Sequence, residues 1–504
     1  MSEVRLRPNI ILIMTDQHRF DCLGCYHHPV IETPNIDWLA SEGTVFDAAY
    51  SPSPSCIPAR ACLMTGMTPW NAGILGMGKG QGPMGVGFKA TLPGELAKLG
   101  YYTKGVGKMH FYPQRSLMGF HSTVIDESGR VEDKGFVSDY VQWFSRQKKG
   151  DYSPVDHGLG WNSWMARPYH LPEYLHPTNW TVNEAVHFLE TRDPSMPYFL
   201  KVSFARPHSP YDPPQHYYDL YKDSPVPTPA IGDWAEVNNV KRDGAYFDAW
   251  RGRRSEEETR RARASYYGLI SHIDNQIGRL LIWLKDHGEL ENTMFIFTSD
   301  HGDMLGDHNL WRKTYAYEGS AHIPMIIKLP KKYRAGQCER VKNPVSLFDI
   351  MPTILDFVSV PIPESVDGES LMPLLYGKDE GFREMIHGEH CECYGPEQEM
   401  QYLTNGRYKY IWLPRIDEEQ LFDLEDDPME CINVVNHVEY RNVLVRFRST
   451  LVDILEKREN GLAKDGRLIC QKGLPPQISP HYQKRLDSSD FNWLAHNRDF
   501  AVKI

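Results

Sequence analysis

Runs of mostly apolar residues recur along the chain, and each run ends in a polar cluster. The clearest runs are "NIILIM" at 9–14, "YFLKVSF" at 198–204 and "MFIFTS" at 294–299. Their length and their lack of strict alternation predict strands that are buried on both faces. Residues 33–43 and 256–287 have helical periodicity instead, and the longer segment places one face of apolar residues at Ile270, Ile273, Ile277, Leu281 and Leu284.

Strands that alternate with helices predict the α/β class, with a large doubly wound, mostly parallel sheet flanked by helices. In such sheets the functional site lies at the carboxyl ends of the strands. The polar residues that follow each apolar run are therefore the first candidates for a site.

Shorter patterns predict the remaining organisation. "TVFDAAYS" at 44–51 is typical of a second strand, and helical character begins after Pro58 and stops near Gly66. From about residue 376 the runs become shorter, and a helical segment follows at 440–458. We therefore expect an α/β catalytic domain over 1–375 and, over 376–504, a smaller α+β subdomain with a small antiparallel sheet, a helix and an extended tail after Lys464.

Composition narrows the function classes. The 504 residues are 41% hydrophobic, which suits a large packed core, and the formal net charge of −11 disfavours nucleic acid and other extended polyanions. Nine scattered cysteines are typical of reduced thiols. No apolar run is long enough to span a membrane and no signal peptide is recognisable, so the expectation is a cytoplasmic protein, or a periplasmic or secreted one if a leader was removed.

Two predicted strands end in acidic residues. Asp16 and Gln17 follow the first strand, and Asp300 and His301 follow the strand at 294–299. A strand-terminal Asp is often only a helix cap, but two acidic ends with an adjacent imidazole favour a divalent metal. Oxygen ligands suit calcium, and the imidazole leaves manganese or zinc open.

Four cationic or titratable groups follow the core strands. They are Lys108 and His110 in "GKMH", His208 in "RPHSP" and Lys313 in "LWRKTY". Such residues are often structural or solvated, but together they could surround one anion. The segment 150–180 is rich in aromatic residues and histidines: Trp161, Trp164, Tyr169, His170, His176 and Trp180. These side chains could form a platform for a substrate ring or pack a long insertion, and the sequence leaves both readings open.

Several of these motifs form a recognisable series. Cys56-Ile57-Pro58-Ala59-Arg60 followed by "LMTGMTPWNAG" resembles the signature of type I sulfatases of the alkaline phosphatase superfamily. "GKMH", "RPHSPY" and "FTSDHGDMLGDHNLWRK" resemble later motifs of that family in the same order. The resemblance implies that Cys56 is oxidised to formylglycine by a maturation enzyme, which recognises the proline and the arginine of the motif.

The resemblance also implies roles for the other candidates. Asp16, Gln17, Asp300, His301 and the modified Cys56 would bind one divalent ion, for which the resemblance favours calcium, with manganese as the alternative. Arg60 would hold the hydrated formylglycine, and His110 would serve this diol during collapse of the intermediate. Lys108 and Lys313 would bind the sulfate oxygens, and His208 with Lys313 would protonate or stabilise the leaving alkoxide.

The implied activity is hydrolysis of a small carbohydrate or aryl sulfate through a covalent sulfo-enzyme intermediate. A phosphonate monoester or phosphodiester hydrolase of the same superfamily is the alternative, although that group lacks the equivalents of Lys108 and His110. Many family members have Asp where Gln17 stands and Asn where His301 stands, so the identity of the metal is left open. The sequence also leaves open whether the protein forms a homo-oligomer.

Overall fold

The main element of the protein is a mixed, mostly parallel sheet of eight strands. A computed structural model describes residues 7–77, 84–241 and 248–487. Neighbouring strands run in the order β5 (Ser122–Ile125), β4 (Tyr102–Gly107), β6 (Tyr198–Pro207), β1 (Asn9–Asp16), β7 (Thr293–Ser299), β8 (Met325–Lys328), β2 (Thr44–Phe46) and β9 (Arg340–Val341). The first five are mutually parallel, and β8 is antiparallel to both of its neighbours. The predicted α/β fold class is thus confirmed.

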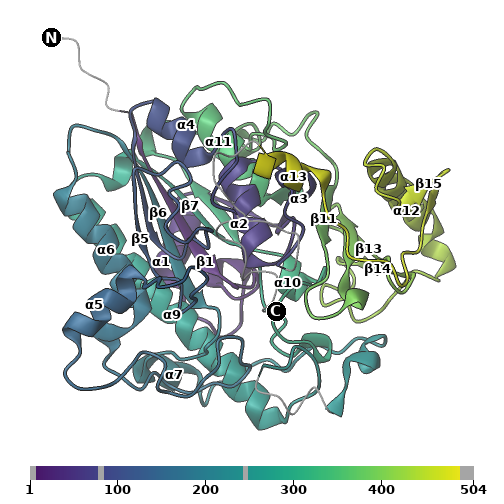
Figure 1. Ribbon diagram of the computed structural model, residues 1–504, viewed down its shortest axis with the longest axis horizontal. Coiled ribbons are helices and arrows are strands. Elements are labelled where there is room, and N and C mark those ends of the chain that lie inside the picture. Colours follow the sequence, from purple (N-terminus) through teal and green to yellow (C-terminus); the bar gives the residue numbers. More distant parts are fainter. Residues whose placement is uncertain (1–6, 78–83, 242–247, 488–504) are drawn as a thin grey trace.

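Helices cover both faces of this sheet (Figure 1). Ile11 and Ile13 of β1 point into a core shared with the helices α1 (Pro34–Ser41), α6 (Pro177–Thr191) and α9 (Glu256–Asp286). Ile10, Leu12 and Met14 point into the opposite core, formed with α2 (Cys56–Thr65), α4 (Leu92–Lys98) and α11 (Ile350–Phe357). Side chains on a strand alternate between faces, so a strand between two helical layers must be apolar throughout.

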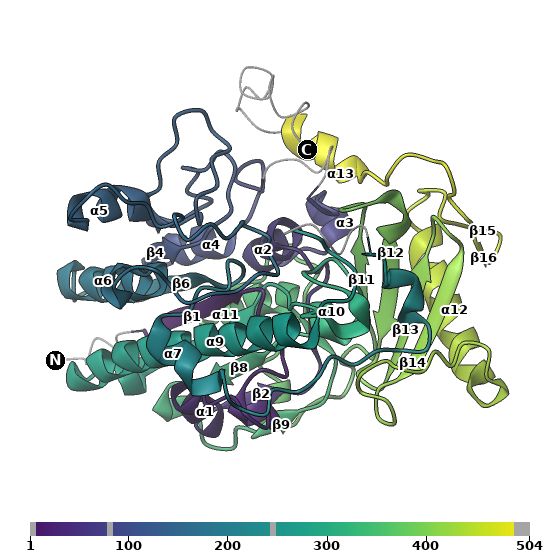
Figure 2. The ribbon, with the colours of Figure 1, turned by 90° about the horizontal axis from the view of Figure 1, so that it is seen from below.

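A smaller subdomain lies at one end of the molecule (Figure 2). It contains an antiparallel sheet of four strands covered by one long helix: β11 (Ile386–His390), β12 (Met400–Thr404), β13 (Tyr408–Leu413), β14 (Glu418–Asp423) and α12 (Arg441–Glu456). This confirms the predicted α+β character of the C-terminal part. The boundary at residue 375 remains a prediction.

Two local predictions in the main domain differ from the structure. The segment 44–51 forms two short strands, since β3 (Ala49–Tyr50) leaves the main sheet and pairs with β10 (Val345–Ser346). Helix α2 begins at Cys56 and includes Pro58, because the first turn of a helix has no intrahelical acceptor for its N–H groups and tolerates proline. It ends as expected at Gly66, whose φ of 68° is left-handed.

The tail was expected to be extended, and this is wrong for part of it. After a short hairpin of β15 (Ala463–Lys464) and β16 (Arg467–Leu468), the chain forms the helix α13 (Pro480–Asp487). Ser479, just before this helix, donates a hydrogen bond of 2.6 Å to the carbonyl of Trp70, so contact with the main domain helps to fix it. Residues 488–504 of the tail lie outside the described residues.

Candidate active site

Four neighbouring parallel strands deliver the predicted site residues to one edge of the sheet. Asp16 ends β1, Lys108 and His110 follow β4, His208 follows β6, and Asp300 follows β7. The N-terminus of α2 brings Cys56 to the same place. All ten predicted side chains are buried, and none is more than 3% exposed: Asp16, Gln17, Cys56, Arg60, Lys108, His110, His208, Asp300, His301 and Lys313.

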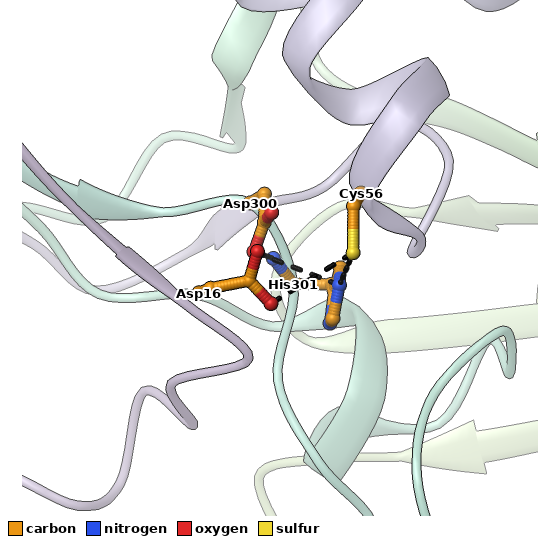
Figure 3. A group of neighbouring side chains, drawn as sticks. All are labelled: Asp16, Cys56, Asp300 and His301. Carbon is orange, nitrogen blue, oxygen red and sulfur yellow. Dashed lines mark hydrogen bonds and ion pairs between the residues drawn. The ribbon is translucent and has the colours of Figure 1, made fainter. Parts of the chain in front are cut away.

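Asp16, Cys56, Asp300 and His301 form the centre of the site (Figure 3). One ligand atom from each lies within 4.8 Å of the others. The Cys56 sulfur is 3.2 Å from His301 Nε2. Because His301 Nδ1 lies 2.9 Å from the carbonyl of Gly302, Nδ1 carries the hydrogen and the Nε2 lone pair faces the cluster. Two carboxylates and an imidazole in this arrangement suit a divalent ion.

Arg60 connects the two carboxylates of the cluster. Its Nε donates to Asp300 and its Nη2 to Asp16, both at 2.8 Å, while Nη1 donates to the carbonyl of Lys108 at 2.7 Å and to the Ser203 hydroxyl at 3.0 Å. Burial opposes the charge, but Asp300 and Asp16 raise the pKa of the guanidinium above its usual value. Arg60 is therefore a fixed cation behind the cluster.

Two lysines approach the cluster from different segments: Lys108 directly follows β4, and Lys313 lies in the connection between β7 and β8. Lys108 Nζ lies 2.7 Å from Asp16 Oδ2 and 4.0 Å from the Cys56 sulfur. Lys313 Nζ donates to Gln17 Oε1 at 2.8 Å, so the structure pairs that amide oxygen with a lysine, and the ligand role of Gln17 remains a prediction. Burial and the Asp16 carboxylate raise the pKa of the Cys56 thiol. Lys108, Lys313 and His301 lower that pKa by more, so it lies below its usual value.

His208 and Lys313 form a close pair. Lys313 Nζ lies 2.6 Å from His208 Nε2, and His208 Nδ1 lies 2.8 Å from the carbonyl of Ser209. The carbonyl can only accept, so Nδ1 carries the hydrogen and Nε2 accepts from the lysine. Burial, followed by Lys313 and Lys108, holds the pKa of His208 well below its usual value, so the imidazole is neutral and the lysine carries the proton.

His110 has a strained backbone and a free imidazole. Its φ is 62°, an uncommon value for a residue other than glycine and one that often marks functional sites. Both ring nitrogens lack a hydrogen-bond partner among the described residues, although the side chain is buried. Burial and the nearby cations Arg130, Lys108 and Arg60 keep the pKa of His110 well below its usual value. A neutral imidazole is thus available to accept a proton.

Several residues that support the site were not predicted. Asp303 accepts a hydrogen bond of 2.5 Å from Gln17 Nε2, and Glu127 accepts one of 2.7 Å from the backbone N–H of His110. His390 of the C-terminal subdomain lies 2.7 Å from the hydroxyl of Ser55, next to Cys56. Asp303 could have been found in the "SDHGD" motif, but nothing in the sequence connects Ser55 with His390.

The aromatic segment divides between the two readings. Trp180 is buried in a small core with Tyr140, Phe144 and Leu175, so it packs the insertion. Trp161 is only half-buried, and its ring lies 5.9 Å from that of His208 and 6.0 Å from Lys108 Nζ. Across the described ranges, no helix has the length and apolar character needed to cross a membrane.

Comparisons with known proteins agree with this geometry. The sulfatase family model matches residues 8–360, and a model described as N-sulphoglucosamine sulphohydrolase, C-terminal, matches residues 306–457. An arylsulfatase of Clostridium perfringens is 44% identical over 94% of this chain and 100% of its own length. A choline-sulfatase of Rhizobium meliloti is 31% identical over 86% of this chain and 83% of its own.

A solved structure is also similar. The crystal structure of a phosphonate monoester hydrolase of Agrobacterium radiobacter superposes with a TM-score of 0.73 at 26% identity, over 90% of this chain and 96% of that one. The family model covers most of the chain, and the arylsulfatase matches along nearly all of it. The chain belongs to the sulfatase family, whose members hydrolyse sulfate esters.

Proposed function

We propose that this sulfatase cleaves sulfate monoesters with a formylglycine formed from Cys56. The main support is the position of the cysteine at the start of α2, where its sulfur contacts His301 at 3.2 Å and Lys108 at 4.0 Å. The sulfur marks the approximate position of one of the two hydroxyl oxygens of hydrated formylglycine, and the second would lie on the same carbon. A formylglycine-generating maturation enzyme is the partner that this proposal requires.

The buried donor set fits one divalent ion. Asp16, Asp300 and His301, with modified Cys56 and a reoriented Gln17, would hold it. The family and the carboxylates favour calcium, with manganese as the second choice. When bound, the ion would polarise the sulfate and lower the pKa of the diol hydroxyl. Lys108 and Lys313 would bind the sulfate oxygens directly.

In the first step, one diol oxygen attacks sulfur while the bond from sulfur to the alcohol oxygen breaks. Asp300 accepts the proton of the attacking hydroxyl. The leaving oxygen receives a proton from the pair of Lys313 and His208, whose ammonium carries it. Two of the three N–H groups of Lys313 are used by Gln17 and His208, and the third remains for the substrate.

In the second step, the sulfate ester of formylglycine collapses. The remaining hydroxyl gives its proton to His110, whose ring nitrogens have no other partner in the described structure. The bond between the formylglycine carbon and the sulfate oxygen then breaks, which releases sulfate and restores the aldehyde. Water hydrates the aldehyde to the diol, so one water molecule is consumed for each ester. An ordinary serine or cysteine ester lacks the second hydroxyl and cannot follow this path.

Phosphonate monoester hydrolysis is the second candidate, and the structural similarity to such an enzyme supports it. A sulfate monoester presents three non-ester oxygens, whereas a phosphonate monoester presents two and an additional carbon substituent. Lys108 directly follows β4, and Lys313 lies in the connection between β7 and β8. We expect the two ammonium groups, approaching from separate segments, to contact all three sulfate oxygens and to leave little room for that substituent. The names of the arylsulfatase and the choline-sulfatase also favour sulfate.

The test compares nitrophenyl sulfate with the nitrophenyl ester of phenylphosphonate, after mass spectrometry has established formylglycine at position 56. We expect kcat/KM to favour the sulfate by at least about 100-fold, which corresponds to roughly 2.7 kcal/mol of transition-state discrimination. Lys108→Ala should narrow that preference, because it removes a contact to the third oxygen. Faster phosphonate turnover by the wild type would support the second candidate, and unmodified cysteine in protein from the native host would contradict the formylglycine mechanism.

A further inference from the structure

A cavity of about 650 Å³ lies beside the catalytic cluster. Residues that follow β5 and β6 line it, together with the first residues of α5 (Asp139–Gln147) and of α6. It therefore opens at the same edge of the sheet as the cluster. Trp161 connects the two, because it lines the cavity and its ring lies 5.9 Å from that of His208.

The lining is largely apolar and aromatic, which suits a ring. It includes Phe136, Tyr140, Val155, Leu159, Trp161 and Tyr169. Trp161 is half-buried, so part of its indole face is available for stacking. A cavity with mostly apolar walls and a few polar groups is the usual form of a small-molecule site.

Asp126 is a buried acid in the lining of this cavity, and one of its oxygens is unpaired within the described ranges. Its side chain is 1% exposed, and Oδ1 accepts the backbone N–H of Ser128 at 2.8 Å. Oδ2 has no hydrogen-bond partner in the described part of the chain, nor does the nearby Ser128 hydroxyl. A buried carboxylate oxygen without a donor is costly, so its presence in a ligand-sized cavity indicates that a ligand supplies the donor.

The surrounding charges indicate which donor this is. Burial, with a smaller contribution from Glu127, raises the pKa of Asp126 to about 6, while the Ser128 N–H and the cations Arg206 and Lys108 act in the opposite direction. An ammonium group in the cavity would lie near these two cations, which would repel it. A neutral hydroxyl can donate to Oδ2 without that repulsion, so it is the better complement.

We propose that this cavity, the Asp126 pocket, holds the leaving-group ring of the sulfate ester, and that Asp126 accepts a hydrogen bond from a free hydroxyl of that ring. The preferred substrate is then the sulfate ester of a hydroxylated ring, a sugar or a dihydroxyaryl compound. The proposal rests on the proposed function, since it places the sulfate at Cys56. It makes Asp126 a specificity-determining residue and Trp161 a stacking surface.

The test measures kcat/KM for two kinds of substrate on the same modified enzyme. Nitrophenyl sulfate has no ring hydroxyl. It is compared with two sets of substrates that carry one: monosaccharide sulfates esterified at each position, and dihydroxyaryl monosulfates such as nitrocatechol sulfate. The set that contains the best substrate identifies the source of the hydroxyl. Asp126→Ala should lower kcat/KM for that substrate about 10- to 100-fold more than for nitrophenyl sulfate, and Asp126→Asn should lie between.

The matched control is Asp151→Asn, at a fully exposed acid that does not line the pocket; it should leave the ratio between the two substrates unchanged. Equal losses on both substrates in Asp126→Ala would overturn the proposal. Absence of activity on every sulfate ester, with formylglycine established, would instead overturn the proposed function.

A second variant avoids any folding defect from the buried position. Val155 lines the pocket and is 58% exposed, so Val155→Trp can narrow the cavity without disturbing the core. We expect at least a tenfold loss of kcat/KM on the best hydroxylated substrate, with unchanged inhibition by inorganic sulfate, which needs only the catalytic cluster. Full activity of Val155→Trp on that substrate would contradict the proposal.

Discussion

The pair of His208 and Lys313 gives the sharpest test of the chemistry. The imidazole accepts from Lys313 at 2.6 Å and donates to the carbonyl of Ser209, so it holds the lysine proton in place. His208→Ala removes this acceptor and leaves the Lys313 ammonium with Gln17 as its remaining side-chain partner. The proton should then be poorly placed for the leaving oxygen.

The size of the effect depends on the leaving group. A positioned acid contributes about 10²- to 10⁴-fold to the rate, or about 2.7–5.4 kcal/mol at 1.36 kcal/mol for each factor of ten. An alkyl sulfate needs the full contribution because an alkoxide leaves poorly. Nitrophenolate leaves without protonation, so the loss on nitrophenyl sulfate should stay below about tenfold.

The assay is kcat/KM for an alkyl sulfate and for nitrophenyl sulfate in His208→Ala, Lys313→Met and the double variant. If the pair acts as one unit, the double variant loses little more than the worse single variant on the alkyl sulfate. Equal losses on the two substrates in His208→Ala would remove His208 from the leaving-group role. Additive losses would mean that the two residues act separately.

Two further predictions concern the metal and the Asp126 pocket. Exhaustive chelation should abolish sulfatase activity, and calcium or manganese should restore it in the wild type but not in Asp300→Asn; full activity after chelation would contradict the metal site. Since burial raises the folded pKa of Asp126 to about 6, its contribution to stability is present below the unfolded value of about 4 and is lost as the pH rises through 6. Asp126→Asn does not titrate, so its melting temperature should rise relative to the wild type between pH 4 and pH 7, and a constant difference would be inconsistent with the raised pKa.

The sheet and its catalytic edge could be predicted because they depend on local patterns. A strand between two helical layers needs apolar residues on both faces, and the polar residue that ends it marks the carboxyl edge. Asp16 and Asp300 follow this rule. The prediction of one strand over 44–51 was wrong, because the first half of this segment pairs with β8 and the second half with β10. The residues of the segment do not by themselves indicate which strands it pairs with.

The supporting contacts of the site were beyond the sequence for a similar reason. His390 and Ser55 are 335 residues apart, and their hydrogen bond depends on how the C-terminal sheet meets α2. The proposed role of Asp126 depends on a cavity whose walls come from several segments between Asp126 and Pro210. Such residues carry no periodicity and no motif, so only the folded arrangement distinguishes them from surface acids or structural histidines.

The charges at the candidate site would allow a chain with a net charge of −11 to bind a small anion there. Arg60 and Lys108 contact Asp16, and Lys313 lies close enough to lower the pKa of Cys56. These three cations outnumber the carboxylates Asp16 and Asp300, so the cluster is locally positive, and a bound divalent ion would add to that charge. A positive site suits the single negative charge of a sulfate monoester. A phosphonate monoester carries the same charge, so charge alone does not separate the two substrates. Discrimination between the sulfate and the phosphonate monoester has to come from the space around the third sulfate oxygen. Lys108→Ala is therefore the decisive variant.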